Sequence, residues 1–579
     1  MSLDDYWGVG PKTRELLEEN LGDSVAEEAI ESADISKLTD SGLARGRATR
    51  IVRQAKGGAG LDVLATSDAR KVYKQLLDLV SGYAVTPGAR DRISVLTPMV
   101  SRTDIEESLT DVLEMRYVWS ELSGETREKI TGIFERYGEA GEGRKAAVDV
   151  ALEAMDLNLD RGRFSELREF DREVLESTRE ALAFLEGDRV DEGADQELDR
   201  LREMNSRVSD LEENSLDIVE NLRGSGVQDV DALQDEFVDH VVGEADVPYG
   251  DVQEAVPENP LDVTDFVTDT LRTLSRNVEE SMEEREEAVR EELAEDLEDH
   301  EGSVDEVSEV VDDLALLVSL ARFAGDLNLT EPEFVEDGVG FVGGRNLGIE
   351  KGSVQPVQFA IGSPGFKEDE NSDVDFPEED LVSVLTGANS GGKTTLLETT
   401  CQIVLLAQMG LPVPAEKAHV SLFDSLVFHR RHASFNAGVL ESTLRSVVPP
   451  LTLEGDTLML VDEFEAITEP GSAADLLHGL VNLTVDSGAH GVFVTHLADD
   501  LEPLPEEARV DGIFAEGLDD ELELDVDYQP RFDTIGKSTP EFIVSRLIAG
   551  ADDQQEKIGF ERLGKSVGEQ EVQQTLSDI

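Results

Sequence analysis

Apolar residues recur three and four positions apart through most of the first 330 residues. Residues 73–85, 105–122 and 174–185 show this spacing clearly, which predicts amphipathic helices. We therefore expect the region 64–330 to be almost wholly helical. Within it, residues 277–302 combine many acidic positions and few apolar ones with strong helix formers, which indicates a long solvated helix. This helix is either a charged surface helix with no function of its own or one arm of a coiled coil.

The pattern changes at about residue 331, where glycines become frequent and short apolar runs alternate with helical ones. The runs 381–385, 457–462 and 491–496 are short and rich in β-forming residues, as expected for buried parallel strands. The region 331–550 is therefore predicted to be an α/β domain. Residues 551–579 are polar with one weakly helical segment, and we expect them to form a tail.

The first 58 residues contain two similar stretches, 6–22 and 38–55, each with a glycine-containing turn followed by an amphipathic helix. Gly57, Gly58 and Gly60 then predict a linker. Residues 41–58 carry five basic side chains and no acidic one. This stretch stands out because the whole chain has 128 Asp and Glu against 50 Lys and Arg, a formal net charge of −78.

The acidic residues are spread over every segment rather than gathered in one tail. Arginine outnumbers lysine, 36 to 14. Such a composition resembles proteins of salt-accumulating cells, and the alternative is an acidic protein that binds basic partners. The single cysteine, Cys401, excludes a disulfide framework and a thiolate metal cluster, and we interpret it as a buried apolar residue.

The start of the sequence has neither the basic region nor the apolar stretch of a secretory signal. No uninterrupted apolar run reaches the roughly 18 residues that a membrane span requires. We therefore expect a cytoplasmic protein without a membrane segment.

The strongest candidate chemistry lies in the sequence TGANSGGKTT, where a predicted strand meets a predicted helix. The GxxxxGKT spacing in this context predicts a phosphate-binding loop for ATP. Its glycines let backbone N–H groups surround phosphate oxygens, and the helix N-terminus favours negative charge. Lys393 is expected to reach the β and γ phosphates, and the Thr394 hydroxyl is expected to bind Mg²⁺. The predicted ATP-binding residues are Gly387, Ala388, Asn389, Ser390, Gly391, Gly392, Lys393, Thr394 and Thr395.

Two further predicted strands end in polar residues. Asp462 and Glu463 stand at the end of the run 457–462, 75 residues after Gly387. In a phosphate-loop NTPase such an aspartate orients the Mg²⁺ shell, and the adjacent glutamate polarises the attacking water. We therefore predict that Asp462 is a metal-binding residue and that Glu463 is catalytic. His496 ends the third strand, where it can sense the γ-phosphate because active sites of parallel sheets lie at strand carboxyl ends; the alternative is a half-buried structural histidine.

The motifs TGANSGGKTT, LMLVDE and GVFVTH together resemble the ATPase domain of the MutS family, within the ABC class. Residues 81–109 resemble the opening of the MutS helical core in the second MutS subfamily, and residues 535–547 resemble the segment that closes the ATPase domain. The resemblance implies a helical core and clamp over 64–330 and an ABC-type phosphate-loop ATPase domain over 331–550. Chromosome-condensing ATPases separate their two nucleotide motifs by hundreds of residues, and transporter ATPases carry a Leu-Ser-Gly-Gly signature that this sequence lacks.

The sequence also departs from the repair enzymes of this family. We expect neither a mismatch-reading domain before the helical core nor a nuclease domain after residue 550, because the sequence leaves little room for either. The stretch FNAGVLES carries Asn436, Ala437 and Gly438 where relatives usually have a Ser-Thr pair. The remaining pattern resembles the archaeal branch of the second MutS subfamily, which implies ATP hydrolysis and DNA binding without sequence preference.

The two N-terminal stretches resemble helix-hairpin-helix elements, in which a Gly-x-Gly hairpin presents backbone N–H groups to a DNA phosphate. The second copy has Ala44 in place of the second glycine. The resemblance implies a tandem helix-hairpin-helix DNA-binding domain over residues 1–58. The alternative is a small helical cap whose arginines pair with nearby acids. The predicted DNA-binding residues are Gly8, Gly10, Lys12, Arg14, Gly42, Arg45, Arg47, Arg50 and Arg53.

The sequence therefore predicts an ATP-hydrolysing, largely sequence-independent DNA-binding protein of the MutS family that acts in DNA repair or recombination, with ATP and Mg²⁺ as cofactors. The alternative is an architectural clamp that recruits partners with little turnover, whereas no metal-binding constellation supports a nuclease. MutS ATPase domains work as pairs, so the resemblance implies a homodimer. Ser434, Asn436 and Gly438 are candidates to complete the neighbouring subunit's site, or they form a surface turn of their own domain. The preferred DNA structure, the pathway and the partner proteins stay open.

Overall fold

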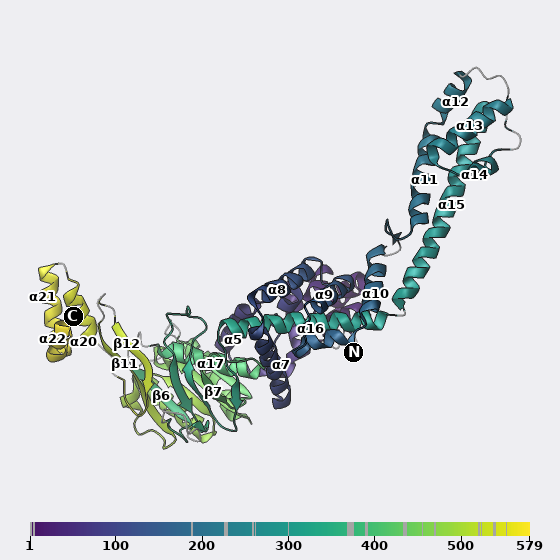
Figure 1. Ribbon diagram of the computed structural model, residues 1–579. Coiled ribbons are helices and arrows are strands. Elements are labelled where there is room, and N and C mark those ends of the chain that lie inside the picture. The colour runs from purple at the N-terminus through teal and green to yellow at the C-terminus, as the bar shows by residue number, and fades with distance from the viewer. Residues whose placement is uncertain are drawn as a thin grey trace. The chain divides into compact units, whose positions relative to one another are not determined.

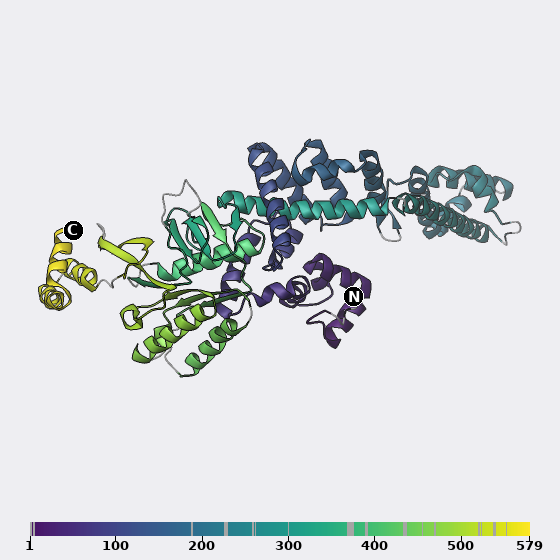
Figure 2. The ribbon, with the colours of Figure 1, turned by 90° about the horizontal axis from the view of Figure 1, so that it is seen from below.

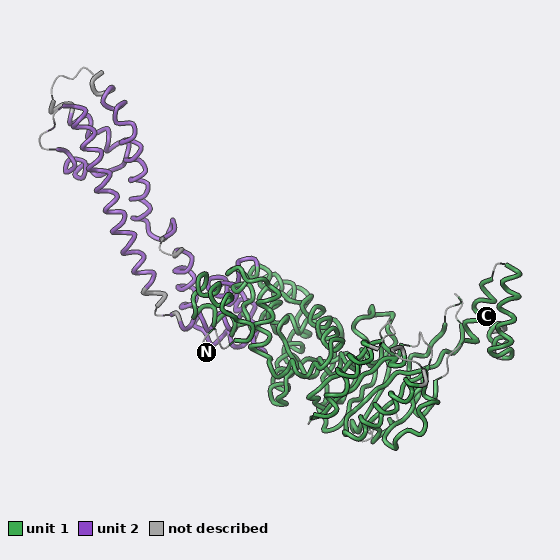
Figure 3. The backbone as a smooth tube through the Cα atoms, turned by 180° about the vertical axis from the view of Figure 1, so that it is seen from behind, with its two compact units in different colours: residues 1–138, 312–579 green, residues 139–311 purple. Residues whose placement is uncertain are grey.

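The chain folds into two compact units, which are coloured separately in Figure 3. One unit contains residues 1–138 and 312–579, and the other contains residues 139–311. The computed structural model describes residues 3, 6–186, 189–224, 230–257, 260, 262–298, 300–366, 376–387, 392–431, 437–453, 455–467, 470–518, 522, 524–536, 540–551 and 553–578. In these ranges, no helix is long and apolar enough to cross a membrane.

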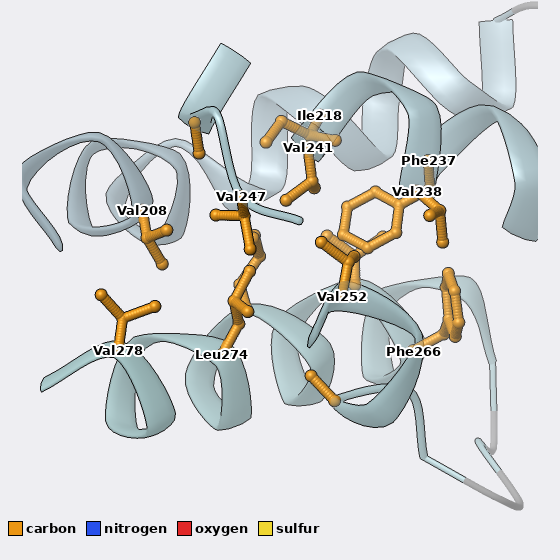
Figure 4. Close-up of a cluster of buried hydrophobic side chains, with 14 of the residues drawn as sticks. Val208, Ile218, Phe237, Val238, Val241, Val247, Val252, Phe266, Leu274 and Val278 are labelled. Atoms are coloured by element: carbon orange, nitrogen blue, oxygen red, sulfur yellow. The ribbon is translucent and has the colours of Figure 1, made fainter. Parts of the chain in front are cut away.

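The unit of residues 139–311 consists almost entirely of helices. Its main elements are α9 (Arg144–Asp156), η2 (Gly162–Glu169), α10 (Arg172–Phe184), β1 (Leu185–Glu186), β2 (Arg189–Val190), α11 (Gln196–Glu213), α12 (Ser215–Gly224), α13 (Val230–Ala245), α14 (Tyr249–Glu254) and α15 (Val263–Glu298). Figure 4 shows the core that α11 to α15 share, in which aliphatic side chains surround Phe237 and Phe266. The two rings meet edge to face, with centroids 5.3 Å apart.

The long acidic helix predicted around residues 277–302 is present as α15, which lies alongside α11 (Figure 1). The few apolar residues of this acidic stretch recur at intervals of four and seven residues, as in a coiled coil. Two of them are buried and two are half-buried against the same clusters. The residues of this stripe are Val278, Met282, Val289 and Leu293. Helix α15 thus packs along this stripe against α11, which is the packing expected of a coiled-coil arm.

The other unit begins with helices. They are α1 (Pro11–Asn20), α2 (Asp23–Ser32), α3 (Ile35–Asp40), α4 (Arg45–Asp62), α5 (Ser67–Ser81), α6 (Pro87–Ser94), α7 (Arg102–Glu121) and α8 (Gly124–Glu139), joined later in the chain by the residues of α16 (Glu301–Asp326) from 312 onward. Figure 2 shows α1–α4 as a purple group around the N-terminus. The sequence therefore predicted helices correctly in this part of the chain.

The glycine linker predicted after the N-terminal stretches is wrong, because α4 continues through Gly57, Gly58 and Gly60. Only Gly57 departs from helical dihedrals, with φ −128° and ψ 24°. A Cβ atom on Gly60 would lie 1.7 Å from the carbonyl oxygen of Pro98, and one on Gly57 would lie 2.0 Å from the Thr97 hydroxyl. These glycines allow the close approach of α4 to the following segment, so their role is packing rather than flexibility.

The α/β domain contains two mixed sheets. The larger has the strand order β12-β11-β6-β10-β9-β8, in which only β12 is antiparallel to its neighbour. The smaller has the order β3-β7-β4-β5. The strands are β3 (Pro332–Phe334), β4 (Val339–Gly344), β5 (Val357–Ile361), β6 (Val382–Gly387), β7 (Lys417–Val420), β8 (Ser425–His429), β9 (Thr457–Asp462), β10 (His490–Val494), β11 (Ala508–Leu518) and β12 (Leu524–Arg531).

The three predicted parallel strands are β6, β9 and β10, which lie next to one another in the larger sheet. Helix α17 (Lys393–Gln408) contacts these strands and also β7 of the smaller sheet. Helices α18 (Ala437–Thr452) and α19 (Pro470–Asp486) bury apolar side chains against the larger sheet. Cys401 is fully buried in α17, as predicted, and this burial raises the pKa of its thiol.

The chain ends in a small helical bundle, drawn in yellow in Figure 1. Helices α20 (Pro540–Ala549), α21 (Gln554–Val567) and α22 (Glu569–Asp578) contact one another. Val544, Ile548 and Val572 form their shared apolar cluster. Residues 551–579 thus hold two helices where the sequence suggested one weakly helical segment.

Candidate functional site

The predicted nucleotide-binding residues lie where the parallel strands of the larger sheet end. Asp462 is the last residue of β9 and pairs in register with Val494 of β10, which in turn pairs with Leu385 of β6. Because adjacent parallel strands end at the same edge, Gly387, Asp462 and the residues after Val494 are brought to one place. The sheet therefore unites segments that are more than 100 residues apart in the sequence.

Helix α17 positions Lys393 and Thr394 at this edge. Gly392 precedes the helix with φ +73°, a left-handed conformation that glycine adopts readily, and a Cβ atom there would lie 2.8 Å from the Tyr528 ring. The ammonium of Lys393 donates a hydrogen bond of 2.9 Å to the carbonyl oxygen of Gly387. Burial lowers the pKa of Lys393, while the carboxylates of Glu463, Asp462 and Glu465 act in the opposite direction. Ala388, Asn389, Ser390 and Gly391 lie outside the described residues.

The side chains of Thr394 and Asp462 meet directly. The Thr394 hydroxyl donates a hydrogen bond of 2.8 Å to Oδ2 of Asp462. Oδ1 of the same carboxyl is buried and has no hydrogen-bond partner among the residues that the structure describes. Burial raises the pKa of Asp462, and the hydrogen bond from Thr394 offsets part of this effect. A buried carboxylate oxygen without a partner beside a hydroxyl group is a suitable place for a hard cation that prefers oxygen ligands.

Glu463 and His496 are also brought together. Nε2 of His496 lies 3.3 Å from Oε1 of Glu463, and the histidine side chain is 31% exposed. The backbone N–H of His496 donates a hydrogen bond of 2.7 Å to Glu465. Glu463 itself has φ +44°, an unusual value for a residue with a side chain, and its backbone N–H is held by Val494. Counting its backbone, His496 is an exposed residue, and its side chain is in contact with the predicted catalytic carboxylate.

Arg431 is a residue of this site that the sequence did not reveal. Its Nη1 atom lies 2.7 Å from Oε2 of Glu463. Arg431 follows β8, whose neighbour in the sheet is β9, and this adjacency brings it to the carboxylate. The available signal was a pair of arginines, Arg430 and Arg431, directly after an apolar strand.

A cavity of about 390 Å³ opens beside these residues. Its polar lining includes Lys393, Thr394 and Glu463. Apart from Leu396 of α17, its apolar lining comes from residues that no motif identifies, and they are contributed by β5, β12 and the segment that precedes β5. These residues are Ile349, Val354, Val357 and the ring of Tyr528. The sheets therefore add an apolar wall to the polar site.

The structure places only some members of two other predicted groups, the remaining ATP-binding residues and the candidates for the neighbouring subunit's site. Thr395 lines the cavity, and its carbonyl oxygen accepts a hydrogen bond of 3.3 Å from the Asn346 side chain. Gly438 is exposed near the start of α18. Ser434 and Asn436, the other candidates for the neighbouring subunit's site, lie outside the described residues.

The two N-terminal glycine turns have matching geometry. Gly8 and Gly42 have φ values of +88° and +93°, and each stands three residues before the first residue of a helix. The turns also pack reciprocally, since a Cβ atom on Gly8 would meet Ile51 and one on Gly42 would meet Leu16. Gly10 directly precedes α1, and Ala44 takes the equivalent place before α4. The sequence repeat is therefore also a structural repeat.

The basic side chains of this N-terminal unit divide into two groups. Arg45 forms an ion pair with the buried Asp91 of α6, and Arg53 donates to the carbonyl oxygen of Ser94 while its guanidinium lies 5.5 Å from the Tyr73 ring centre. These two arginines attach α4 to the helical core, as the cap alternative supposed. A second group is directed to the surface. Lys12, Arg47 and Arg50 are exposed, and Arg14 is half-buried and paired with Glu18.

Comparison with known proteins shows which proteins this chain resembles. Residues 383–499 match the family model described as MutS domain V. The chain is 40% identical over 324 residues to the DNA-binding protein MutS2 of Pyrococcus furiosus, covering 55% of each chain. It is 28% identical over 214 residues to the endonuclease MutS2 of Thermomicrobium roseum, covering 34% of this chain and 25% of that protein.

A third relative comes from the mismatch-repair branch. It is the DNA mismatch repair protein MutS of Granulibacter bethesdensis, 31% identical over 218 residues that cover 35% of this chain and 22% of that protein. The matches thus span about half, or less, of the length of these curated relatives. The matches support a relationship of this chain to the MutS family, and in particular to its second subfamily.

Proposed function

We propose that this protein hydrolyses ATP and binds DNA largely without sequence preference, and that it acts in DNA repair or recombination. One observation carries the proposal: Lys393, Thr394, Asp462 and Glu463 converge at the carboxyl edge of a parallel sheet, beside a cavity. These are the residue types that phosphoryl transfer to water requires, because it depends on positioning and on charge stabilisation.

Residues 387–395 would bind the triphosphate of ATP. The Lys393 ammonium would move from the Gly387 carbonyl oxygen to the β and γ phosphates, which carry the stronger opposite charge. The apolar wall that includes Val357 and Tyr528 offers a surface for the base, because aromatic and aliphatic side chains suit a planar ring. The cavity thus has an apolar and a polar part in keeping with a nucleotide.

Thr394 and Asp462 fit a Mg²⁺ ion. The fit rests on the buried Oδ1 of Asp462, which is unpartnered in the part of the chain that the structure describes, and on the hydroxyl that already hydrogen-bonds the same carboxyl. When bound, Mg²⁺ neutralises the negative charge that develops on the phosphate oxygens during transfer. Asp462 would be ionised in that state, because the ion opposes the effect of burial on its pKa.

Glu463 would accept a proton from the attacking water, and His496 would sense the γ-phosphate from beside it. The distance of 3.3 Å between the two side chains supports a joint role. Glu463 is only 13% exposed, which keeps competing bulk water away from its carboxylate.

The N-terminal helix-hairpin-helix repeats would hold DNA through the backbone N–H groups at the two glycine turns. The exposed Lys12, Arg47 and Arg50 would contact phosphates on either side. Such short, oriented contacts suit an acidic protein, because diffuse attraction weakens steeply as salt rises. Arg45 and Arg53 would support this surface by holding α4 on the core.

A homodimer would complete the nucleotide sites, with Ser434, Asn436 and Gly438 of one subunit near the triphosphate of the other. Mixing subunits tests this arrangement. Lys393→Ala subunits cannot bind the triphosphate, and Asn436→Asp subunits place a negative charge against it, so each parent should be inactive. A mixed dimer contains one intact composite site, and partial activity should return. No recovery, in heterodimers shown to form, would contradict the shared site.

Turnover and nucleotide binding, measured with and without DNA, test the proposed function itself. The wild-type protein should hydrolyse ATP, whereas Lys393→Ala should lose ATP binding because the phosphates lose their buried counter-charge. DNA-stimulated turnover supports an ATPase cycle coupled to DNA. ATP binding with negligible turnover would instead support the architectural clamp.

A further inference from the structure

The carboxylate of Glu463 is held at both of its oxygens. Oε1 faces Nε2 of His496 at 3.3 Å, and Oε2 faces Nη1 of Arg431 at 2.7 Å. The two partners come from different strands of the sheet, since Arg431 follows β8 and His496 follows β10. The contact to Arg431 is the shorter one and the one that involves a permanent charge.

The backbone at Glu463 explains why such a contact matters. Glu463 adopts φ +44°, and its N–H donates to Val494 at 3.0 Å, so the side chain leaves the strand end in an uncommon direction. A glutamate side chain has three rotatable bonds and loses appreciable freedom when it is fixed. Contacts at the carboxylate are therefore needed to keep it in one orientation.

We propose that Arg431 is a positioning residue for ATP hydrolysis, which fixes the Glu463 carboxylate so that its other oxygen can receive the proton of the attacking water. The proposal rests on the proposed ATPase function. In the step that it serves, the water oxygen bonds to the γ-phosphorus and its proton goes to Glu463. The bond from the γ-phosphorus to the bridging oxygen breaks, which releases ADP and inorganic phosphate.

Two neighbouring arginines show what sets Arg431 apart. Arg430 pairs with Glu398 of α17 at 2.7 Å, and its guanidinium lies 5.2 Å from the Phe428 ring centre, so it joins a strand end to a helix. Arg445 pairs with Glu441 one turn away on the exposed face of α18. Exposed pairs of this kind contribute little to stability. Of these three arginine pairs, only that of Arg431 involves the predicted catalytic carboxylate.

Arg431→Ala tests the proposal, with Arg445→Ala as the matched control that also removes one arginine of an ion pair. We expect Arg431→Ala to lower kcat about tenfold and to leave the affinity for ATP within about twofold, because positioning affects part of the 10²- to 10⁴-fold supplied by general-base catalysis. Arg431→Lys should restore part of kcat, since its single charge can still reach Oε2. Arg445→Ala should match wild type in both quantities.

A double variant separates positioning from direct contact with phosphate. In a Glu463→Gln background, Arg431→Ala should lower the residual turnover no further, because Arg431 acts through Glu463. A further tenfold loss there, or a kcat of Arg431→Ala equal to or above wild type, would overturn the proposal while leaving the ATPase function intact. If wild-type turnover does not exceed that of Lys393→Ala, the proposed function itself fails.

Discussion

The carboxyl edge of the larger sheet and the N-terminal unit α1–α4 both gather basic side chains, but they are built in opposite ways. At the sheet edge, Lys393 and Arg431 come from distant segments and lie against Asp462 and Glu463. In the N-terminal unit, the basic residues come from two copies of one local pattern, and Arg47 and Arg50 are exposed. One region therefore balances its charge internally, and the other presents charge outward.

The difference shows how an acid-rich chain keeps positive charge usable. The carboxylates that balance charge at the sheet edge are the ones that the proposed chemistry itself requires. In the N-terminal unit, residues 41–58 contain no acid, so their arginines cannot pair within this stretch, and Arg47 and Arg50 are exposed. Residues 139–311, by contrast, contain 54 acidic and 16 basic residues, so the summed charge of this unit is strongly negative.

The largest expected effect lies at the sheet edge. Glu463→Gln should lower ATP turnover by about 10²- to 10⁴-fold while ATP binding persists, because the amide cannot accept the proton but keeps the shape of the side chain. Steady-state turnover and equilibrium ATP binding measure the two parts. Glu441→Gln, which changes an exposed glutamate of α18, is the control and should match wild type. Near-normal turnover in Glu463→Gln would contradict the catalytic role of Glu463, and the sheet edge would then no longer differ from the N-terminal unit in its proposed chemistry.

The next effect concerns the outward charge. The double variant Arg47→Ala, Arg50→Ala should weaken duplex DNA binding by about tenfold at moderate salt and reduce the slope of log affinity against log salt by about 2. Basal ATP turnover should not change. The control removes two arginines from exposed pairs elsewhere, Arg207→Ala with Arg276→Ala. Equal affinities for the two double variants would show that another surface holds the DNA.

Tryptophan fluorescence sharpens the location of this surface. Of the two tryptophans, Trp7 is 57% exposed next to the turn at Gly8, whereas Trp119 is only 8% exposed in the core. DNA bound at the hairpins should change the emission of Trp7, and Trp7→Phe should abolish the change while binding remains measurable by mobility shift. Unchanged emission in a protein that demonstrably binds DNA would direct attention away from this turn.

The smallest effect concerns the core beside the N-terminal unit, where Asp312 accepts a hydrogen bond of 2.8 Å from Tyr137. Burial raises the pKa of Asp312 above its usual value, with Asp313 and Asp34 adding to the effect. A raised folded-state pKa means that stability is lost as pH rises from the ordinary carboxyl range through the raised pKa. Asp312→Asn should therefore raise the melting temperature at pH 7 by about 2 °C.

The gain from Asp312→Asn should vanish at a pH below the ordinary aspartate pKa, where the wild-type carboxyl is protonated in both the folded and the unfolded state. Thermal melts at neutral and acidic pH measure this difference. A gain that is independent of pH would show that packing, rather than the charge, is responsible.

Much of the fold follows from local pattern. The three-and-four spacing predicts the helices, and the short apolar runs predict β6, β9 and β10, because each signal reflects which side of an element is buried. The burial of Cys401 also follows from its apolar surroundings. The acidic helix α15 was identified as well, but its partner α11 was not. A stripe of apolar residues indicates that one face of a helix is buried, but it does not indicate which other helix covers that face.

Other features depended on segments that the sequence separates widely. Gly60 was interpreted as a linker residue because Gly57 and Gly58 lie within three residues of it, whereas its role is set by the carbonyl group of Pro98. Arg45 is attached to the core by its ion pair with Asp91, which lies 46 residues further along the chain. No spacing rule within one segment contains that information.

The sequence alone identified the candidate residues that meet at the sheet edge, because the spacing of Gly387, Lys393 and Thr394 and the acidic pair Asp462–Glu463 are local patterns. Only the tertiary structure decided what surrounds them. The contact of Arg431 with Glu463 and the wall formed by Tyr528 depend on strand order, which joins β8 to β9 and β11 to β12. Strand order is set by the burial of the apolar faces of the sheets against the helices that cover them. The free energy of this burial is a property of the whole folded domain, so no single segment of the sequence contains it.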